Sequence, residues 1–266
     1  TTTTTTYSQA SIRDIVGGTL INPVDSNSDL VNVSEGRELS AMSMSYDGTQ
    51  YGIRATSGSY DAVVKVSQPL VNGWTLSGSI IQFTAPGSIA SNSLRALVSS
   101  SDGNVIAFRM NTIIKVYGFS NGVWSQLGSD IVPSVSNPNE ISVDLSSDGM
   151  TLATLSSYSD HVAETKIYSY SSGGWVQLGS TIKLGSNTIK ISGDGTTLAL
   201  GNHAPNWGIN SIRVYRMVST DWEIVSPSMN LSAMNPSNFF GAGLNLTNDG
   251  STLTTFNNSG VEFSNF

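Results

Sequence analysis

The chain has 266 residues, of which only 12% are charged, and its formal net charge is −7. This acidic balance leaves no basic patch to neutralise phosphates, so we expect no nucleic-acid partner. No apolar run reaches the ~18 residues that a membrane-spanning helix requires, so we expect no membrane insertion, and the absence of cysteine rules out a disulfide framework.

A run of threonines opens the chain. Dense hydroxyl side chains cannot form a packed core, so we expect residues 1–10 to be a threonine-rich leader or tether. This composition is compatible with a disordered leader and with an O-glycosylated tether. The O-glycosylation candidates are Thr1, Thr2, Thr3, Thr4, Thr5 and Thr6.

An Asp-Gly phrase then recurs five times, as in SSDGMTLAT around Asp148-Gly149. Before that copy, Ile141, Val143 and Leu145 alternate with polar residues, which is the period of a strand. Asp-Gly tolerates the positive φ angles of tight hairpins, so each copy predicts two antiparallel strands joined by such a turn. The five glycines, spaced 55, 46, 46 and 55 residues apart, are Gly48, Gly103, Gly149, Gly195 and Gly250.

A second phrase, GGWVQLGSTI in one of its clearest copies, follows each of the first four Asp-Gly phrases and predicts an outer strand. Its tryptophans, spaced 50, 51 and 47 residues apart, are Trp74, Trp124, Trp175 and Trp222. Units of about fifty residues with four short strands match the period of propeller blades. We therefore expect residues 11–266 to form one all-β domain, a five-bladed β-propeller with four antiparallel strands per blade.

The fifth unit has no tryptophan phrase, because the sequence stops at GVEFSNF, a third strand. Near the N-terminus, RDIVGGTLI matches the second half of the tryptophan phrase, with Val16, Gly17 and Leu20 in the matching positions. We expect the strand at residues 11–22 to complete the last blade, residues 241–266. This pairing would close the ring and remove its open edges.

A small residue stands four positions after each Asp-Gly glycine. Because blades pack face to face, we expect a close contact between neighbouring blades at this slot. The five small residues are Gly52, Ala107, Ala153, Ala199 and Thr254.

Four Asn-x-Ser/Thr sequons are candidates for N-glycosylation. Some will arise by chance in a chain rich in Asn and Ser, but three are expected on one face of the ring. Asn32 and Asn230 are expected in loops that lead to the next blade, and Asn257 in a loop between second and third strands. Asn245 falls inside an innermost strand, where attachment is hard, and ranks last.

The only two histidines, His161 and His203, are expected in loops between second and third strands. No carboxylate cluster accompanies them, so we interpret them as loop residues and expect no metal site and no cofactor. Three aromatic residues on the same loop face, together with His203, are candidates for contact with a ligand or a subunit. The aromatic residues, which could stack on sugars or meet a neighbouring subunit, are Trp207, Phe239 and Phe240.

Propeller glycosidases place paired carboxylates at the central funnel. Asp144 is the clearest acid on an inner strand, opposite Lys190 and Asn245 of neighbouring copies. It points away from Val143 and Leu145, towards either the channel or a neighbouring blade, and no partner acid can be identified. The turn aspartates are better explained as hairpin formers than as calcium ligands, because no loop alternates several oxygen ligands.

The tryptophan phrase, followed by L-S-x-D-G-x-T-L-A and then I-Y-x-Y, resembles propeller repeats of large secreted proteins from aquatic bacteria, microalgae and some giant viruses. The second to fourth copies match this pattern well, and the first and last are degraded. The resemblance implies an extracellular surface module, loosely akin to WD-type propellers.

We therefore expect a non-catalytic, extracellular, structural or adhesive glycoprotein module of a surface matrix or filament. Its partners would be other protein subunits, copies of itself included, or glycans. The alternative is a lectin-like, carbohydrate-binding propeller with repeated pockets between its blades. A propeller glycoside hydrolase is less compatible with the scarcity of acids.

Overall fold

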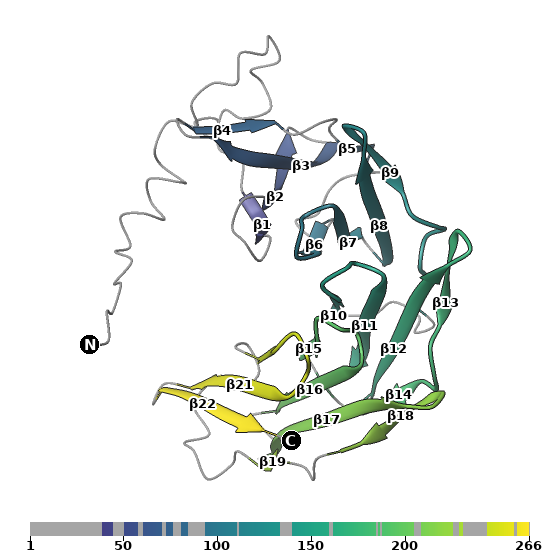
Figure 1. Ribbon diagram of the computed structural model, residues 1–266, viewed down its shortest axis with the longest axis vertical. Coiled ribbons are helices and arrows are strands. Elements are labelled where there is room, and N and C mark those ends of the chain that lie inside the picture. Colours follow the sequence, from purple (N-terminus) through teal and green to yellow (C-terminus); the bar gives the residue numbers. More distant parts are fainter. Residues whose placement is uncertain are drawn as a thin grey trace.

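The computed structural model describes residues 39–44, 51–57, 61–70, 73–76, 81–84, 94–110, 112–133, 140–159, 162–184, 186, 188–204, 209–225, 229–230, 244–257 and 260–265. These residues form five antiparallel β-sheets, which confirms the all-β prediction (Figure 1). In this part of the chain, no helix is long and apolar enough to cross a membrane. The expected leader at residues 1–10 and the expected closing strand at residues 11–22 lie outside the described residues.

Each sheet is built from consecutive strands. The first contains β1 (Leu39–Met44), β2 (Tyr51–Ser57), β3 (Asp61–Leu70), β4 (Gly73–Leu76) and β5 (Ile81–Thr84). The second contains β6 (Leu94–Ser99), β7 (Val105–Met110), β8 (Ile113–Ser120) and β9 (Val123–Gln126). The third contains β10 (Glu140–Leu145), β11 (Thr151–Ser159), β12 (Val162–Ser171), β13 (Gly174–Gln177) and β14 (Ile182–Lys183). The fourth contains β15 (Thr188–Ile191), β16 (Thr197–Ala204), β17 (Ile209–Val218), β18 (Asp221–Ile224) and β19 (Met229–Asn230). The fifth contains β20 (Asn245–Leu246), β21 (Thr252–Asn257) and β22 (Gly260–Asn265).

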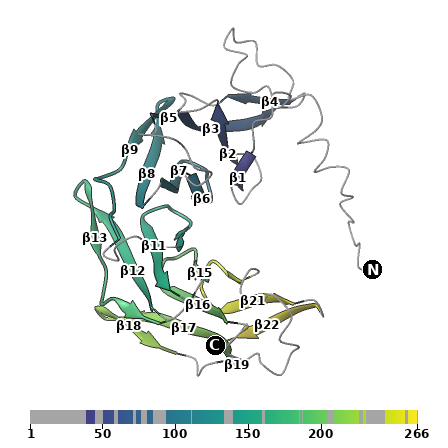
Figure 2. The same ribbon diagram turned by 180° about the vertical axis from the view of Figure 1, so that it is seen from behind.

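The sheets follow one another in an arc, as propeller blades do (Figures 1 and 2). The strands β1, β6, β10 and β15 lie on the inner side of the arc, and β4, β9, β13 and β18 lie on the outer side. The first and last sheets stand at the two ends of the arc. This arrangement brings the turns after the inner strands close together.

The expected outer strand is divided in two. In the third sheet, β13 and β14 both pair with β12, and residues 178–181 between them are not in a strand. Gly179 in this interruption has a φ of 75°, which a residue with a Cβ adopts only with strain. The phrase WVQLGSTI therefore makes two short strands separated by a glycine bend, where the sequence pattern predicted one strand.

The Asp-Gly turn is also longer than predicted. Ser146 N donates to Thr151 O at 2.9 Å, so residues 147–150 form a four-residue loop in which Gly149 has a φ of 73°. Asp148 Oδ1 accepts hydrogen bonds from Ser146 Oγ and Met150 N at 2.6 and 2.8 Å. The aspartate is therefore a turn former, as predicted. Two-residue turns with two positive φ angles occur instead between the third and fourth strands, at Asn121-Gly122 and Ser172-Gly173.

Each of two tryptophans ties its sheet to the preceding one. Trp175 Nε1 donates to Leu127 O at 2.8 Å, and Trp222 Nε1 donates to Leu178 O at 3.0 Å. A Cβ on Gly179 would lie 2.7 Å from Trp222 Cδ1, so the indole ring rests directly on the glycine. Each of these two tryptophans therefore bonds to the leucine and packs on the glycine of the Leu-Gly pair in the preceding sheet, which explains why both parts of the phrase recur.

The predicted small-residue slot is buried. Ala107, Ala153 and Ala199 are each 0% exposed. Ala153 belongs to the same apolar cluster as Ile189 and Ile191 of the next sheet. The other two alanines likewise join clusters with residues of the sheet that follows them. These contacts confirm the predicted close approach of neighbouring sheets at the three alanines, whereas Thr254 is partly exposed and lines a cavity.

Candidate functional site

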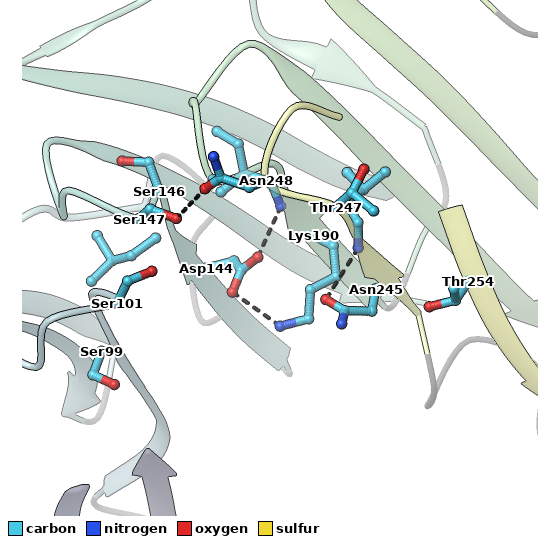
Figure 3. Close-up of a pocket in the computed structure, with 14 residues that line it drawn as sticks. Ser99, Ser101, Asp144, Ser146, Ser147, Lys190, Asn245, Thr247, Asn248 and Thr254 are labelled. Carbon is cyan, nitrogen blue, oxygen red and sulfur yellow. Dashed lines mark hydrogen bonds and ion pairs between the residues drawn. The ribbon is translucent and has the colours of Figure 1, made fainter. Parts of the chain in front are cut away.

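A cavity of about 790 Å³ lies where the inner strands of four sheets end (Figure 3). Fourteen of the described residues line it, from the ends of β6, β10, β15 and β20, the turns that follow them, and β21. Six of these residues carry hydroxyl groups: Ser99, Ser101, Ser146, Ser147, Thr247 and Thr254. Two asparagines, Asn245 and Asn248, add amide groups.

Repeated strand register brings three polar side chains to one wall of the cavity. Asp144, Lys190 and Asn245 stand at equivalent positions of β10, β15 and β20, each opposite the small-residue slot of the next strand. Figure 3 shows them in a row across the three strands. The residues that directly follow them, Leu145, Ile191 and Leu246, also line the cavity and belong to the apolar clusters between sheets.

Asp144 is a cross-sheet anchor. Its Oδ1 accepts a hydrogen bond from Lys190 Nζ at 3.0 Å, and its Oδ2 accepts one from Ile191 N at 2.8 Å. The Asp144 side chain is 11% exposed and that of Lys190 is 33% exposed. Burial raises the pKa of Asp144, against the opposite effects of Lys190 and of the Ile191 N–H. The two orientations that the sequence left open are combined, because Asp144 bonds to the neighbouring sheet and also lines the cavity.

The rim of the cavity is held by bonds between turns. Ser147 Oγ donates to Asn248 Oδ1 at 2.7 Å and so links the third sheet to the fifth. Between them, Ser147 N donates to Gly193 O and Asp194 N donates to Asn248 O, each at 2.8 Å. A Cβ on Gly193 would overlap the side chains of Asn248 and Ser147. Gly193 is therefore required for this bridge, which spans the fourth sheet.

Three of the four sequons lie within the described residues, and all three are in strands. Asn245 lies in the inner strand β20, as predicted, and is exposed in the cavity, where its Oδ1 accepts from Leu246 N at 3.1 Å. Asn230 is the last residue of β19, paired with Ser211, and Asn257 is the last residue of β21. The loop positions predicted for Asn230 and Asn257 are therefore wrong, because strand pairing extends to both residues. Asn32 lies outside the described residues.

Of the proposed contact residues, His203 lies within the described part of the chain. His203 lies within β16 and pairs with Asn210, so its predicted loop position is wrong, because the β16–β17 pairing extends further than the hydrophobic pattern indicates. Trp207, Phe239, Phe240, His161 and Thr1–Thr6 lie outside the described residues. Among the described residues, no three His, Cys, Asp or Glu side chains are grouped so as to hold a metal ion.

Ser147 and Asn248 are site residues that the sequence pattern did not indicate. Both stand immediately before an Asp-Gly pair, where the other copies have Tyr46, Ser101 and Gly193. The signal that could have found them is the glycine at this position in the fourth copy. Its missing side chain leaves the space that Ser147 and Asn248 share.

No protein-family model matches the chain, and no curated protein matches it in sequence. Several solved structures are similar in fold. A protein of unknown function from Desulfotomaculum acetoxidans has a TM-score of 0.58 at 13% identity, covering 87% of this chain and 66% of its own. A proposed 6-phosphogluconolactonase from Bacteroides uniformis has a TM-score of 0.51 at 16% identity, covering 82% of this chain and 79% of its own. A proposed 6-phosphogluconolactonase from Bacteroides fragilis has a TM-score of 0.51 at 13% identity, covering 73% of this chain.

The present chain spans 55% of the length of the Bacteroides fragilis protein. The two Bacteroides proteins are β-propellers. At identities of 13–16%, the likeness concerns the path of the backbone and not the residues of a site. Together with the arc of antiparallel sheets, it shows that this chain has a β-propeller-like fold.

Proposed function

We propose that this chain is a non-catalytic structural or adhesive module of an extracellular surface, matrix or filament. In this proposal it is a five-bladed propeller closed by its N-terminal strand. The described part of the fifth sheet has three strands, whereas each of the other sheets has at least four. We propose that residues 11–22, which carry half of the tryptophan phrase, supply the fourth strand beside the outer edge of β22.

The proposal that the chain is non-catalytic rests on the hydrogen bonding of Asp144. It is the single carboxylate among the fourteen residues that line the cavity. Both of its oxygens accept hydrogen bonds that join two sheets. Glycoside hydrolysis normally requires two carboxylates on either side of the scissile bond. A single, structurally engaged carboxylate does not meet this requirement.

The cavity also differs from what a phosphorylated substrate would require. Phosphate is usually recognised by arginine or lysine side chains that are free to form charge-assisted hydrogen bonds. Among the described residues that line this cavity, the single cationic one is Lys190, and it is paired with Asp144. We therefore do not extend the lactonase activity proposed for two of the structural neighbours to this chain.

We propose that the module is glycosylated and that its partners are copies of itself, other surface proteins or glycans. Asn32, Asn230 and Asn257 remain the leading N-glycan acceptors, and Thr1–Thr6 the O-glycan acceptors. Carbohydrate binding is a second candidate function. The hydroxyl and amide groups of the cavity favour it, although Leu145, Ile191 and Leu246 also line the cavity.

Two measurements test this proposal. Glycopeptide mass spectrometry on protein from the native source should find sugar on at least one of the named residues, and bare protein would remove the glycoprotein assignment. In a screen of glycosides and sugar lactones, the purified chain should release no product. Hydrolysis that is lost in Asp144→Asn but kept in the outer-face control Asp130→Asn would make the chain an enzyme.

A further inference from the structure

We infer that the cavity at the inner strand ends is a binding site for one uncharged saccharide, held by Asn245, Asn248, Ser101 and Thr254. The inference rests on the proposed non-catalytic role only in that the sugar should be released unchanged. It replaces the expected series of pockets between blades with one site, to which four sheets contribute.

The charge of the lining selects an uncharged ligand. Lys190 and Asp144 are the only charged residues among the fourteen that line the cavity, and they form an ion pair at 3.0 Å. A charged ligand would lose water on entering and would find no unpaired opposite charge to compensate. An uncharged ligand avoids this cost. It must instead supply hydrogen-bonding groups that match the polar lining.

The hydrogen-bonding groups available in the cavity match the hydroxyls of a sugar. Within the described residues, the amide nitrogens of Asn245 and Asn248 have no hydrogen-bond partner. The same holds for the hydroxyls of Ser101 and Thr254. An amide nitrogen donates two hydrogen bonds, and a hydroxyl both donates and accepts. Sugar hydroxyls also do both, so one sugar ring can satisfy several of these groups together.

These groups are held in place before a ligand arrives. Asn245 Oδ1 accepts from Leu246 N, and Asn248 Oδ1 accepts from Ser147 Oγ. Since each amide oxygen is engaged, the orientation of each amide group is set and its nitrogen remains available. Ser101 N donates to Ser147 O at 2.9 Å, which positions the turn that carries the Ser101 hydroxyl. Groups that are already ordered lose less conformational freedom on binding.

The size of the cavity and its lack of aromatic residues define the expected ligand and affinity. A volume of about 790 Å³ lies within the usual range for small-molecule sites. None of the described residues that line it is aromatic, so these residues offer the apolar face of a sugar no stacking contact. We therefore expect a mono- or disaccharide with a Kd on the order of 1 mM, which corresponds to about −4 kcal/mol.

The experiment is a titration of the full chain, followed by saturation-transfer NMR and calorimetry. The neutral probes are glucose, galactose, mannose and N-acetylglucosamine with their disaccharides, and glucose 6-phosphate is the anionic probe. At least one neutral sugar should bind, and glucose 6-phosphate should bind more weakly than glucose. Ser101→Ala and Thr254→Val should each weaken binding about 5-fold, the effect of one hydrogen bond. Ser125→Ala, which removes an exposed hydroxyl on the outer strand β9, should leave the Kd unchanged.

The result that overturns the inference is the absence of neutral-sugar binding at tens of millimolar, well above the expected Kd. Preference for glucose 6-phosphate would also overturn it, as would binding that Ser101→Ala and Thr254→Val leave unchanged. Circular dichroism of each variant separates loss of binding from loss of fold, and the two cavity variants serve as independent tests. A sugar that is bound and then cleaved would refute the non-catalytic role while supporting the binding site.

Discussion

The contact between Gly179 and Trp222 can be tested with a matched pair of glycine substitutions. Gly179 has a φ of 75°, and a Cβ there would lie 2.7 Å from Trp222 Cδ1 and 2.9 Å from Asp221 Oδ1. Gly173 has a similar φ of 83°, but a Cβ there would meet nothing within 4 Å. Alanine at either position should cost about 1–2 kcal/mol for the left-handed backbone. The two substitutions therefore differ in packing and not in backbone strain.

Gly179→Ala carries an additional packing cost. Trp222 is 8% exposed, and its Nε1 is bonded to Leu178 O at 3.0 Å, so the indole cannot move aside without losing that bond. Overpacking of a filled site typically costs about 1–3 kcal/mol. We expect Gly179→Ala to lower the free energy of unfolding by about 1–3 kcal/mol more than Gly173→Ala does. The two variants should therefore have clearly different urea midpoints.

The assay is urea unfolding at equilibrium, monitored by tryptophan fluorescence and circular dichroism. The same comparison in a Trp222→Ala background removes the ring that the new methyl group would meet. The difference between the two glycine positions should therefore shrink to the effect of the remaining contact with Asp221 Oδ1. Equal destabilisation by Gly179→Ala and Gly173→Ala in the wild-type background would refute the inter-sheet contact as the reason for this glycine.

Three further perturbations test the fold. Ala153→Leu should lower the free energy of unfolding by about 1–3 kcal/mol, because Ala153 is fully buried against the next sheet, and an unchanged urea midpoint would contradict this. Hydrogen bonds from Ser251 N, Thr247 Oγ1 and Ser251 Oγ lower the pKa of Asp249 to about 2, from 3.8. Its contribution to stability is therefore complete above about pH 4 and is lost as the pH falls towards 2. Asp249→Asn should have a lower free energy of unfolding than wild type at pH 6, and this difference should close as the pH falls to 2. A difference that is independent of pH would refute this assignment. Deleting residues 1–21 should cause aggregation by exposing the edge of β22, as light scattering can detect, and a monodisperse truncated chain would argue against closure by that segment.

Local patterns in the sequence were enough to predict the strands and the contact between sheets. The alternation of Ile141, Val143 and Leu145 predicted β10, and the recurring small residue predicted the buried slot at Ala153. Both features repeat at a fixed distance from Asp-Gly. In antiparallel pairing, that distance sets which residues lie opposite one another. The spacing of residues in the sequence was therefore enough to predict this strand and this buried slot.

The sequence predicted the boundaries between strands and loops less accurately. His203 and Asn257 were expected in loops but belong to strands, because hydrogen bonding between neighbouring strands continues past the apolar residues. The Asp-Gly turn is closed by the Ser146 and Asp148 side chains, which stabilise a four-residue loop where a two-residue turn was predicted. Side chains that bond to nearby backbone groups can select a turn type that the dipeptide alone does not reveal.

The sequence by itself determined the repeat, the all-β class and the positions of the turn aspartates, since each depends on residues close together in the chain. Only the tertiary structure decided what the inner residues do. Ser147 and Asn248 are 101 positions apart, and their hydrogen bond exists because the curvature of the arc brings the third and fifth sheets together above Gly193. Asp144 likewise is a structural anchor because Lys190 Nζ and Ile191 N, on the next inner strand, lie within hydrogen-bonding distance of its carboxylate. Hydrogen bonds act over about 3 Å, so the pairing of distant residues depends on how the sheets are packed and not on the spacing of residues along the chain.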